Sequence, residues 1–320
     1  MKINDEVYGR HEIKESVLIN LINSNAVQRL KGVSQFGMPD EYYHKKGYSR
    51  YGHSMGVLVL LRRLNANLDE QVAGLLHDVS HTAFSHVIDW VLGDPTKEDY
   101  QDNNHLDVIN NSDLPTILEK QGFDYKKISD LENFSLLERE APGLCADRID
   151  YTLREIEDSE LVKKIIFDLR NLSGQLVFQN VGVAESFANE YSRMQKEHWA
   201  GNQARARYYI LSRILKEGIE KKFISVDDFM KTDNEVIQLL KKSNDESILG
   251  KLNLLQTSLE IIECGEGVEL KKKFRYIDPE VLVGRNVILL TRISFDYNSF
   301  LKKEKQNSNN YKKVKIKGFN

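Results

Sequence analysis

The chain has few of the residues that mark several classes of protein. It has only two cysteines, Cys145 and Cys264, in 320 residues, which are too few and too far apart for a zinc knuckle or a disulfide framework. Its five prolines leave long stretches with an uninterrupted helical period. We therefore expect any metal site to use histidine and carboxylate ligands, which suit Mn, Fe, Co, Ni or Zn.

The chain also lacks a long hydrophobic run and a large excess of one charge. Its longest apolar run, GVLVLL, is followed by Arg62 and Arg63 and is far shorter than a bilayer span. The N-terminal MKINDEVYGR has no apolar stretch of the kind found in secretory signals. The net charge of -3 and the pI of about 6.3 give no general attraction to nucleic acids or membranes. We expect a cytoplasmic protein.

Most of the sequence has apolar residues spaced with the period of an α-helix. Segments 54–68 and 70–80 both read as apolar helices. One long helix is predicted over residues 186–222. We therefore predict a mainly α fold, with an all-helical core over residues 1–215.

The pattern changes toward the C-terminus. Segments 268–277 and 286–297 favour β-strands. We predict a smaller helical and mixed α+β region over residues 216–320, which ends in a basic, polar tail.

Three of the eight histidines lie in one short stretch, GLLHDVSHTAFSH. His77 and Asp78 follow an apolar helix, where burying an ionised carboxylate is costly unless a cation or hydrogen bonds compensate it. His53 precedes another apolar helix, and Asp147 opens a further segment flanked by apolar residues. These residues predict either a buried helix with well-paired polar groups or the floor of a metal site.

Four motifs, RYGHSMGV, AGLLHDVSHTAFSHVID, HLDVI and ADRIDYTLRE, together resemble the HD-domain metal-dependent phosphohydrolases. Within that superfamily the chain is most similar to the branch of bacterial deoxyguanosine triphosphate triphosphohydrolases and the mammalian SAM- and HD-domain dNTP triphosphohydrolase. The similarity covers about two-thirds of the chain. It implies a helical HD core, a bound divalent metal and a nucleotide substrate.

The resemblance also implies roles for individual residues. It makes the metal ligands His53, His77, Asp78 and Asp147. It places near the phosphates, as catalytic groups, His81, Asp89 and the general acid His105. It assigns contacts with the substrate to Arg50, Tyr151 and His198.

The chemistry of phosphate hydrolysis agrees with these roles. A divalent ion held by two histidines and two aspartates leaves open positions for a water and a phosphate oxygen, and it lowers the pKa of that water. Arg50, with Lys45 or Lys46, is then placed to hold the other phosphates. His105 or His81 protonates the leaving oxygen, because histidine titrates near neutral pH. Mg²⁺ on the substrate phosphates is a second expected cofactor.

Several alternatives remain open at this level. The leading prediction is a (deoxy)nucleoside triphosphate triphosphohydrolase. The first alternative is a nucleotide phosphatase or phosphodiesterase with the same metal site, and the second is a non-catalytic nucleotide-sensing scaffold. We expect a homo-oligomer, a dimer or larger. Nucleic-acid binding through the basic tail around Tyr311 is less favoured, because the net charge is negative.

Overall fold

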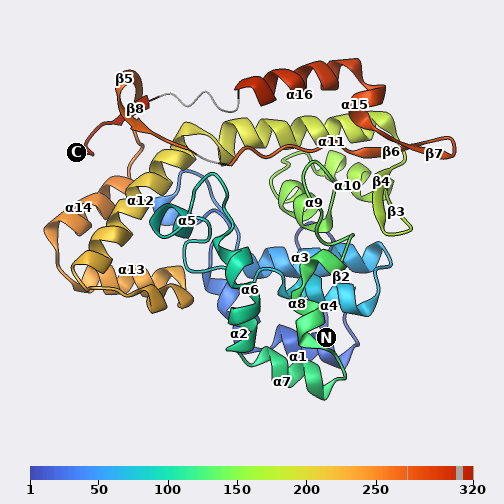
Figure 1. The fold of residues 1–320 in the computed structure, drawn as a ribbon, viewed down its shortest axis with the longest axis horizontal. Coiled ribbons are helices and arrows are strands. Elements are labelled where there is room, and N and C mark those ends of the chain that lie inside the picture. The colour runs from blue at the N-terminus through green and yellow to red at the C-terminus, as the bar shows by residue number, and fades with distance from the viewer. Residues whose placement is uncertain (272, 308–312, 320) are drawn as a thin grey trace.

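Helices build most of the molecule (Figure 1). The computed structural model describes residues 1–271, 273–307 and 313–319. The α-helices of the first half are α1 (Ser16–Ile22), α2 (Asn25–Arg29), α3 (Arg50–Arg63), α4 (Leu68–Leu76), α5 (Val87–Val91), α6 (Tyr100–Asn110), α7 (Leu114–Lys120), α8 (Tyr125–Ser129) and α9 (Ala146–Leu153). Those of the second half are α10 (Ser159–Asp168), α11 (Val181–Met194), α12 (Asn202–Glu220), α13 (Asp233–Lys242), α14 (Glu246–Leu255), α15 (Leu290–Ile293) and α16 (Phe295–Asn307). The predicted mainly α fold is confirmed.

Short helical turns and strands complete the chain. The 3₁₀ turns are η1 (Leu30–Gly32), η2 (Asp40–Tyr42), η3 (Leu131–Asn133) and η5 (Val226–Met230), and η4 (Gln195–Trp199) is a π-helical turn. The strands are β1 (Lys2–Asp5), β2 (Gly9–Glu12), β3 (Leu169–Leu172), β4 (Gln175–Phe178), β5 (Ile261–Glu269), β6 (Glu280–Val283), β7 (Asn286–Leu289) and β8 (Lys313–Ile316). They form an antiparallel β1–β2 pair, a sheet of order β3-β4-β6-β7 and an antiparallel β5–β8 pair.

The prediction of an all-helical core over residues 1–215 is wrong in two places. The hairpins β1–β2 and β3–β4 both lie in this region. Each of their strands has only four residues, which is too short for a clear alternating pattern. β4 also pairs in parallel with β6 through Phe178 and Val281. The division of the chain near residue 215 stays a prediction, because this sheet takes strands from both sides of it.

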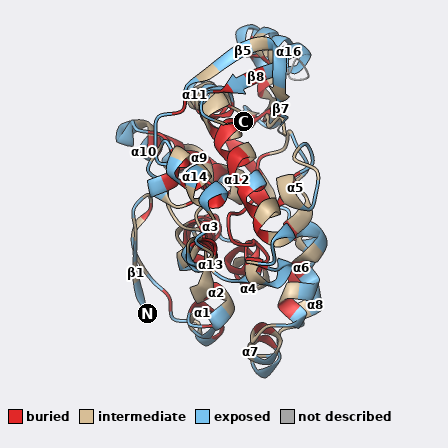
Figure 2. Cartoon of the chain, turned by 90° about the vertical axis from the view of Figure 1, so that its left-hand side faces the viewer, coloured by how far each residue is buried: buried red, intermediate tan, exposed pale blue. Residues whose placement is uncertain are grey.

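Two apolar clusters form the interior, and buried residues run through its central helices (Figure 2). One cluster joins residues between 8 and 194 to residues between 277 and 301. The other packs α12 against α5, α13 and α14. The cavity described below lies among side chains from both parts of the chain.

The predicted long helix over 186–222 is interrupted in the structure. α11 ends at Met194, the π-helical η4 follows, and α12 begins after Gly201. A Cβ at Gly201 would collide with the main-chain carbonyl of Glu197, so only glycine fits this turn. Helical spacing alone does not reveal such a break. π-helical turns occur often at functional sites, and this one carries His198 and Trp199.

The strand predictions near the C-terminus are only partly right. β5 ends at Glu269, and residues 273–279 run as unpaired chain. β7 covers only the first four residues of segment 286–297, and α15 and α16 follow it. The basic tail contributes the end of α16 and strand β8, while Tyr311 lies outside the described residues. Within the described residues, every helix is too short or too polar to traverse a bilayer.

Candidate active site

Three helices bring together the residues of the predicted metal site. Ser49 caps α3 by accepting a hydrogen bond from Gly52 N, which places His53 in the first turn of that helix. α4 ends at Leu76, so His77 leaves its C-terminus. Asp147 lies in the first turn of α9. α3 and α9 can approach closely because Gly56 faces Asp150 and Arg154, with no room for a Cβ.

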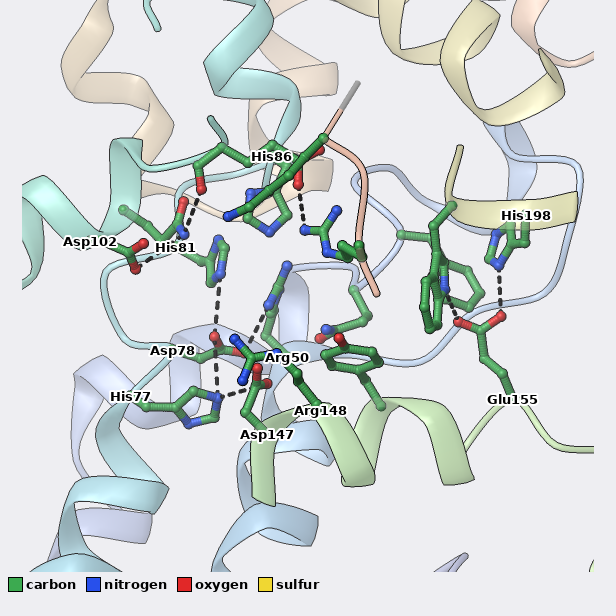
Figure 3. Close-up of a pocket in the computed structure, with 18 of the residues that line it drawn as sticks. Arg50, His77, Asp78, His81, His86, Asp102, Asp147, Arg148, Glu155 and His198 are labelled. Carbon is green, nitrogen blue, oxygen red and sulfur yellow. Dashed lines mark hydrogen bonds and ion pairs between the residues drawn. The ribbon is translucent and has the colours of Figure 1, made fainter. Parts of the chain in front are cut away.

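The donor atoms of these residues converge on one point, and Figure 3 shows His77 and Asp147 facing each other there. Nε2 of His53 lies 2.9 Å from Oδ1 of Asp147 and 3.3 Å from Nε2 of His77. The same aspartate oxygen lies 3.6 Å from Nε2 of His77. Such separations are those of ligands that share one ion at about 2.0–2.2 Å.

Hydrogen bonds on the far side of each ring orient the two histidines. Nδ1 of His77 faces the carbonyl of Gly74 at 2.8 Å and must therefore donate a proton to it. Nδ1 of His53 lies 2.7 Å from Oδ2 of Asp150. Both Nε2 atoms therefore present lone pairs to the shared point, as in histidines that bind metals. These donors fit a divalent transition-metal ion.

The pKa shifts of these residues indicate that positive charge is favoured at this point. Burial alone would lower the pKa of His53, but hydrogen bonds to Asp147 and Asp150 outweigh it and raise the pKa to about 9. The pKa of Asp147 lies well below its usual range, because hydrogen bonds from His53 and His77 outweigh the effect of burial. A metal ion would take the place of the extra proton.

Asp78, the fourth predicted ligand, borders this point but shares its carboxylate with other groups. Oδ2 accepts a hydrogen bond from Arg50 Nη1 at 3.0 Å. Oδ1 lies 3.2 Å from His81 Nε2 and 3.5 Å from His77 Nε2. Burial would raise the pKa of Asp78, but Arg50 and the neighbouring histidines hold it well below its usual value. The group is therefore an anion at the edge of the three convergent donors.

A cavity of about 250 Å³ opens beside these residues. The predicted residues that line it are Arg50, His77, Asp78, His81, Asp147, Tyr151 and His198. Tyr151 shares a hydrogen bond of 2.8 Å with the hydroxyl of Tyr191. Burial and then Arg50 lower the pKa of His81 to about 4. The structure therefore gathers most of the predicted site around one space.

Two predicted catalytic residues do not line the cavity. His105 is buried, and its Nδ1 lies 3.0 Å from Ser80 Oγ. Burial and then His77 lower the pKa of His105 to about 4, so the ring is neutral at pH 7. Asp89 is fully buried and accepts a hydrogen bond from Tyr100 N at 3.1 Å. Their catalytic roles stay predictions.

Several lining residues were not foreseen. Arg148 lines the cavity and donates to Glu138 at 3.0 Å. Its place next to Asp147 in the motif ADRIDY could have indicated this position from the sequence. Lys273 and Arg275 also line the cavity, from a stretch predicted as a strand more than 100 residues further along the chain. No local pattern marks those two, because only the fold brings that stretch to the cavity.

The other end of the cavity is a closed hydrogen-bond network around Glu155. Oε2 accepts from His198 Nδ1 at 2.6 Å and from Lys45 Nζ at 2.9 Å. Oε1 accepts from Trp199 Nε1 at 2.6 Å. On its other side, His198 Nε2 lies 3.0 Å from Tyr43 OH. Lys45, considered above as a phosphate ligand, is thus paired within the protein.

Comparisons with known proteins identify the family of the chain. A model of the HD domain matches residues 50–165. The chain is 38% identical over 295 residues to protein YdhJ of Bacillus subtilis, covering 88% of this chain and 89% of the relative. It is 33% identical over 298 residues to the metal-dependent phosphohydrolase cns2 of Cordyceps militaris, covering 87% of this chain and 84% of the relative.

Two further similarities are more distant. Deoxynucleoside triphosphate triphosphohydrolase SAMHD1 of Bos taurus is 32% identical over 102 residues, which are 27% of this chain and 17% of the relative. The crystal structure of a phosphohydrolase from Bacteroides thetaiotaomicron superposes with a TM-score of 0.62 at 16% identity, covering 92% of this chain and 94% of that one.

The chain belongs to the HD-domain family of metal-dependent phosphohydrolases. It is therefore a hydrolase whose His and Asp cluster is able to bind a metal. The family predicted from the four motifs is confirmed.

Proposed function

We propose that this protein hydrolyses a phosphate bond of a nucleotide, with a (deoxy)nucleoside triphosphate as substrate and inorganic triphosphate as product. The observation that carries the proposal is the convergence of His53, His77 and Asp147 beside a cavity whose mixed lining includes arginine, lysine and aromatic side chains. Cationic side chains suit phosphate oxygens, and aromatic rings suit a nucleoside. The partial similarity to a dNTP triphosphohydrolase supports the choice of substrate.

The positions of the residues support a proposed role for each. We assign the metal to His53, His77 and Asp147, with Asp78 as the fourth ligand; a bound Mn, Fe, Co, Ni or Zn ion supplies Lewis acidity and an activated water. Arg50, fixed by Asp78 and by Ser85 Oγ at 3.1 Å, lies where it can donate to a phosphate oxygen.

The groups around the phosphates complete the assignment. His81, held against Asp78, is positioned to move a proton near the phosphates. His105 is neutral at pH 7, so it serves as general acid only when an adjacent phosphate anion raises its pKa. Asp89 does not line the cavity and acts through its neighbour His86, 3.5 Å away, which does.

The nucleoside would occupy the remaining space of the cavity. Tyr151 offers a ring near the sugar and packs edge-on against Trp199, with 5.1 Å between the ring centroids, and His198 precedes Trp199 in η4. Mg²⁺ bound to the substrate phosphates would add to the positive charge. We keep the expected homo-oligomer as a proposal, which light scattering on a size-exclusion column tests directly.

The experiment that tests the proposal is product analysis. The purified protein is incubated with Mn²⁺ and a panel of nucleoside mono-, di- and triphosphates and cyclic nucleotides, beside Asp147→Ala. Nucleoside plus triphosphate, absent in the variant, is the expected result. Turnover of no member of the panel would contradict the proposal and favour a nucleotide sensor with the same fold.

One observation favours a nucleotide monophosphatase as the second candidate. Six carboxylates and four lysine or arginine side chains line the cavity, so its own charge is negative before a metal binds. A triphosphate brings more negative charge into this space than a monophosphate does, at a greater electrostatic cost. Release of inorganic phosphate from nucleoside monophosphates, with triphosphates untouched, would establish this alternative.

A further inference from the structure

The stretch from Lys273 to Tyr276 contributes four consecutive side chains to the cavity. It runs as unpaired chain, and Figure 3 shows it as an orange trace beside the labelled residues. The HD-domain match ends at residue 165, so this wall comes from a part of the chain outside the matched domain.

Two contacts fix the stretch in place. Arg275 forms an ion pair with Glu98, whose side chain is buried. Glu98 has a φ of 52°, a left-handed conformation that is unfavourable for glutamate. The same residue lines the cavity. Gln195 Nε2 also donates to the carbonyl of Lys273 at 3.3 Å. The main chain of Lys273 is therefore held between η4 and the cavity.

The cations that line the cavity differ in one respect. Each guanidinium already has a carboxylate partner, in the pairs Arg50–Asp78, Arg148–Glu138 and Arg275–Glu98. Lys273 forms no ion pair with any residue in the part of the chain that the structure describes. Burial and then Arg275 lower the pKa of Lys273 by more than the carboxylates of Glu98 and Asp102 raise it. An anion that enters the cavity would compensate this charge.

We propose that Lys273 is a substrate-binding residue whose ammonium donates to a phosphate oxygen of the nucleotide. The inference deepens the proposed function and rests on it. An ammonium is a compact donor with three protons and needs no fixed bidentate geometry, which suits a phosphate whose position the metal site sets. Substrate binding then depends on the C-terminal part of the chain as well as on the HD motifs.

The test compares Lys273→Met with Lys271→Met, which removes an exposed charge two residues away that does not line the cavity. The full chain loaded with Mn²⁺ is titrated with inorganic phosphate by calorimetry, and KM and kcat are measured on the best nucleotide of the panel. We expect K273M to weaken phosphate binding and raise KM by about tenfold or more, with kcat little changed, as for loss of a charge-assisted hydrogen bond. K271M should match the wild type, and K273R should restore most of the affinity.

The outcomes separate this inference from the proposed function. If K273M keeps its melting temperature and metal content but binds phosphate as the wild type does, the inference is overturned, whatever the enzyme hydrolyses. Equal losses in K273M and K271M would also overturn it, because they would reflect overall charge. If no nucleotide is turned over and K273M alone loses phosphate binding, the proposed function fails while the anion-binding role of Lys273 stands.

Discussion

The two ends of the cavity use similar side chains in opposite ways. At the metal end, two imidazole nitrogens and a carboxylate oxygen point at one another, and the far sides of both rings are already hydrogen-bonded. At the other end, Glu155 accepts from three donors, and His198 has a partner on each nitrogen. The three donors at the metal end are able to hold a cation, whereas the donors and acceptors at the Glu155 end already pair with one another within the protein.

This difference separates a binding site from a structural support. Lone pairs that converge without a proton repel one another, so a cation that binds at the metal end relieves this repulsion. A buried carboxylate with every donor matched stabilises the folded chain and gains little from a ligand. The predictions below test this contrast, from the largest expected effect to the smallest.

The largest effect is expected from Asp147→Ala. It removes the oxygen shared by both histidines, so metal content and turnover should fall by roughly a hundredfold or more, beyond the loss typical of outer-shell partners. Bound metal is measured by mass spectrometry and activity by product release. Asp227→Ala, at an exposed position, is the control. An Asp147→Ala protein with full metal content would contradict the assignment.

Asp150→Asn should act more weakly, through His53. The carboxylate orients His53 by accepting from its Nδ1, and loss of such a partner lowers metal affinity by about 10–100-fold. Titration with Mn²⁺ or Zn²⁺ measures the change. The matched control is Asp107→Asn on the exposed face of α6. Metal affinity unchanged from the wild type would show that Asp150 only supports Arg154, with which it forms an ion pair of 2.7 Å.

At the other end, Glu155→Gln should change stability and leave metal binding alone. Glutamine offers one acceptor oxygen where glutamate serves three donors, so at least one buried donor loses its partner at a cost of about 1–3 kcal/mol. Urea unfolding measures this cost, and Glu157→Gln, on an exposed residue next to α9, is the control. Loss of metal from Glu155→Gln would mean that the two ends are coupled.

An ion pair outside the cavity should give the smallest effect. A hydrogen bond from Arg62 lowers the pKa of Glu15 to about 2 from its ordinary 4.5. A lowered carboxyl pKa means that the stabilisation is complete above pH 4.5 and is lost as pH falls toward 2. Because the pair is partly exposed, we expect about 0.5–1 kcal/mol. Urea unfolding of Glu15→Gln should differ from the wild type at pH 6 and converge with it in acid; a constant difference would contradict this.

Whether a feature of this protein could be predicted from the sequence depends on whether neighbouring residues or contacts between distant residues determine it. His77 and Asp78 stand out in the sequence because charged or ligating groups beside an apolar helix need a partner. Gly201 gave no such signal, because a glycine within a helical pattern reads equally well as a tolerated residue or as a break. The clash that excludes a side chain there arises only from the folded turn.

The site residues divide in the same way. The predicted metal ligands lie in motifs of a few residues, at helix ends that local periodicity already indicates. Glu155 and Lys273 owe their surroundings to contacts across 110 and 78 residues, with Lys45 and Gln195 respectively. Such contacts depend on how helices pack, which no window of neighbouring residues encodes.

The order of histidines and aspartates along the chain was therefore enough to indicate the family and its metal chemistry, because those groups are costly to bury without a purpose. Tertiary structure alone decided which end of the cavity is able to hold a cation and which closes on itself. It also decided that Lys273, far along the chain from the HD motifs, reaches the cavity. These features depend on distances between side chains, and those distances exist only once α3, α4, α9 and the C-terminal stretch have packed together.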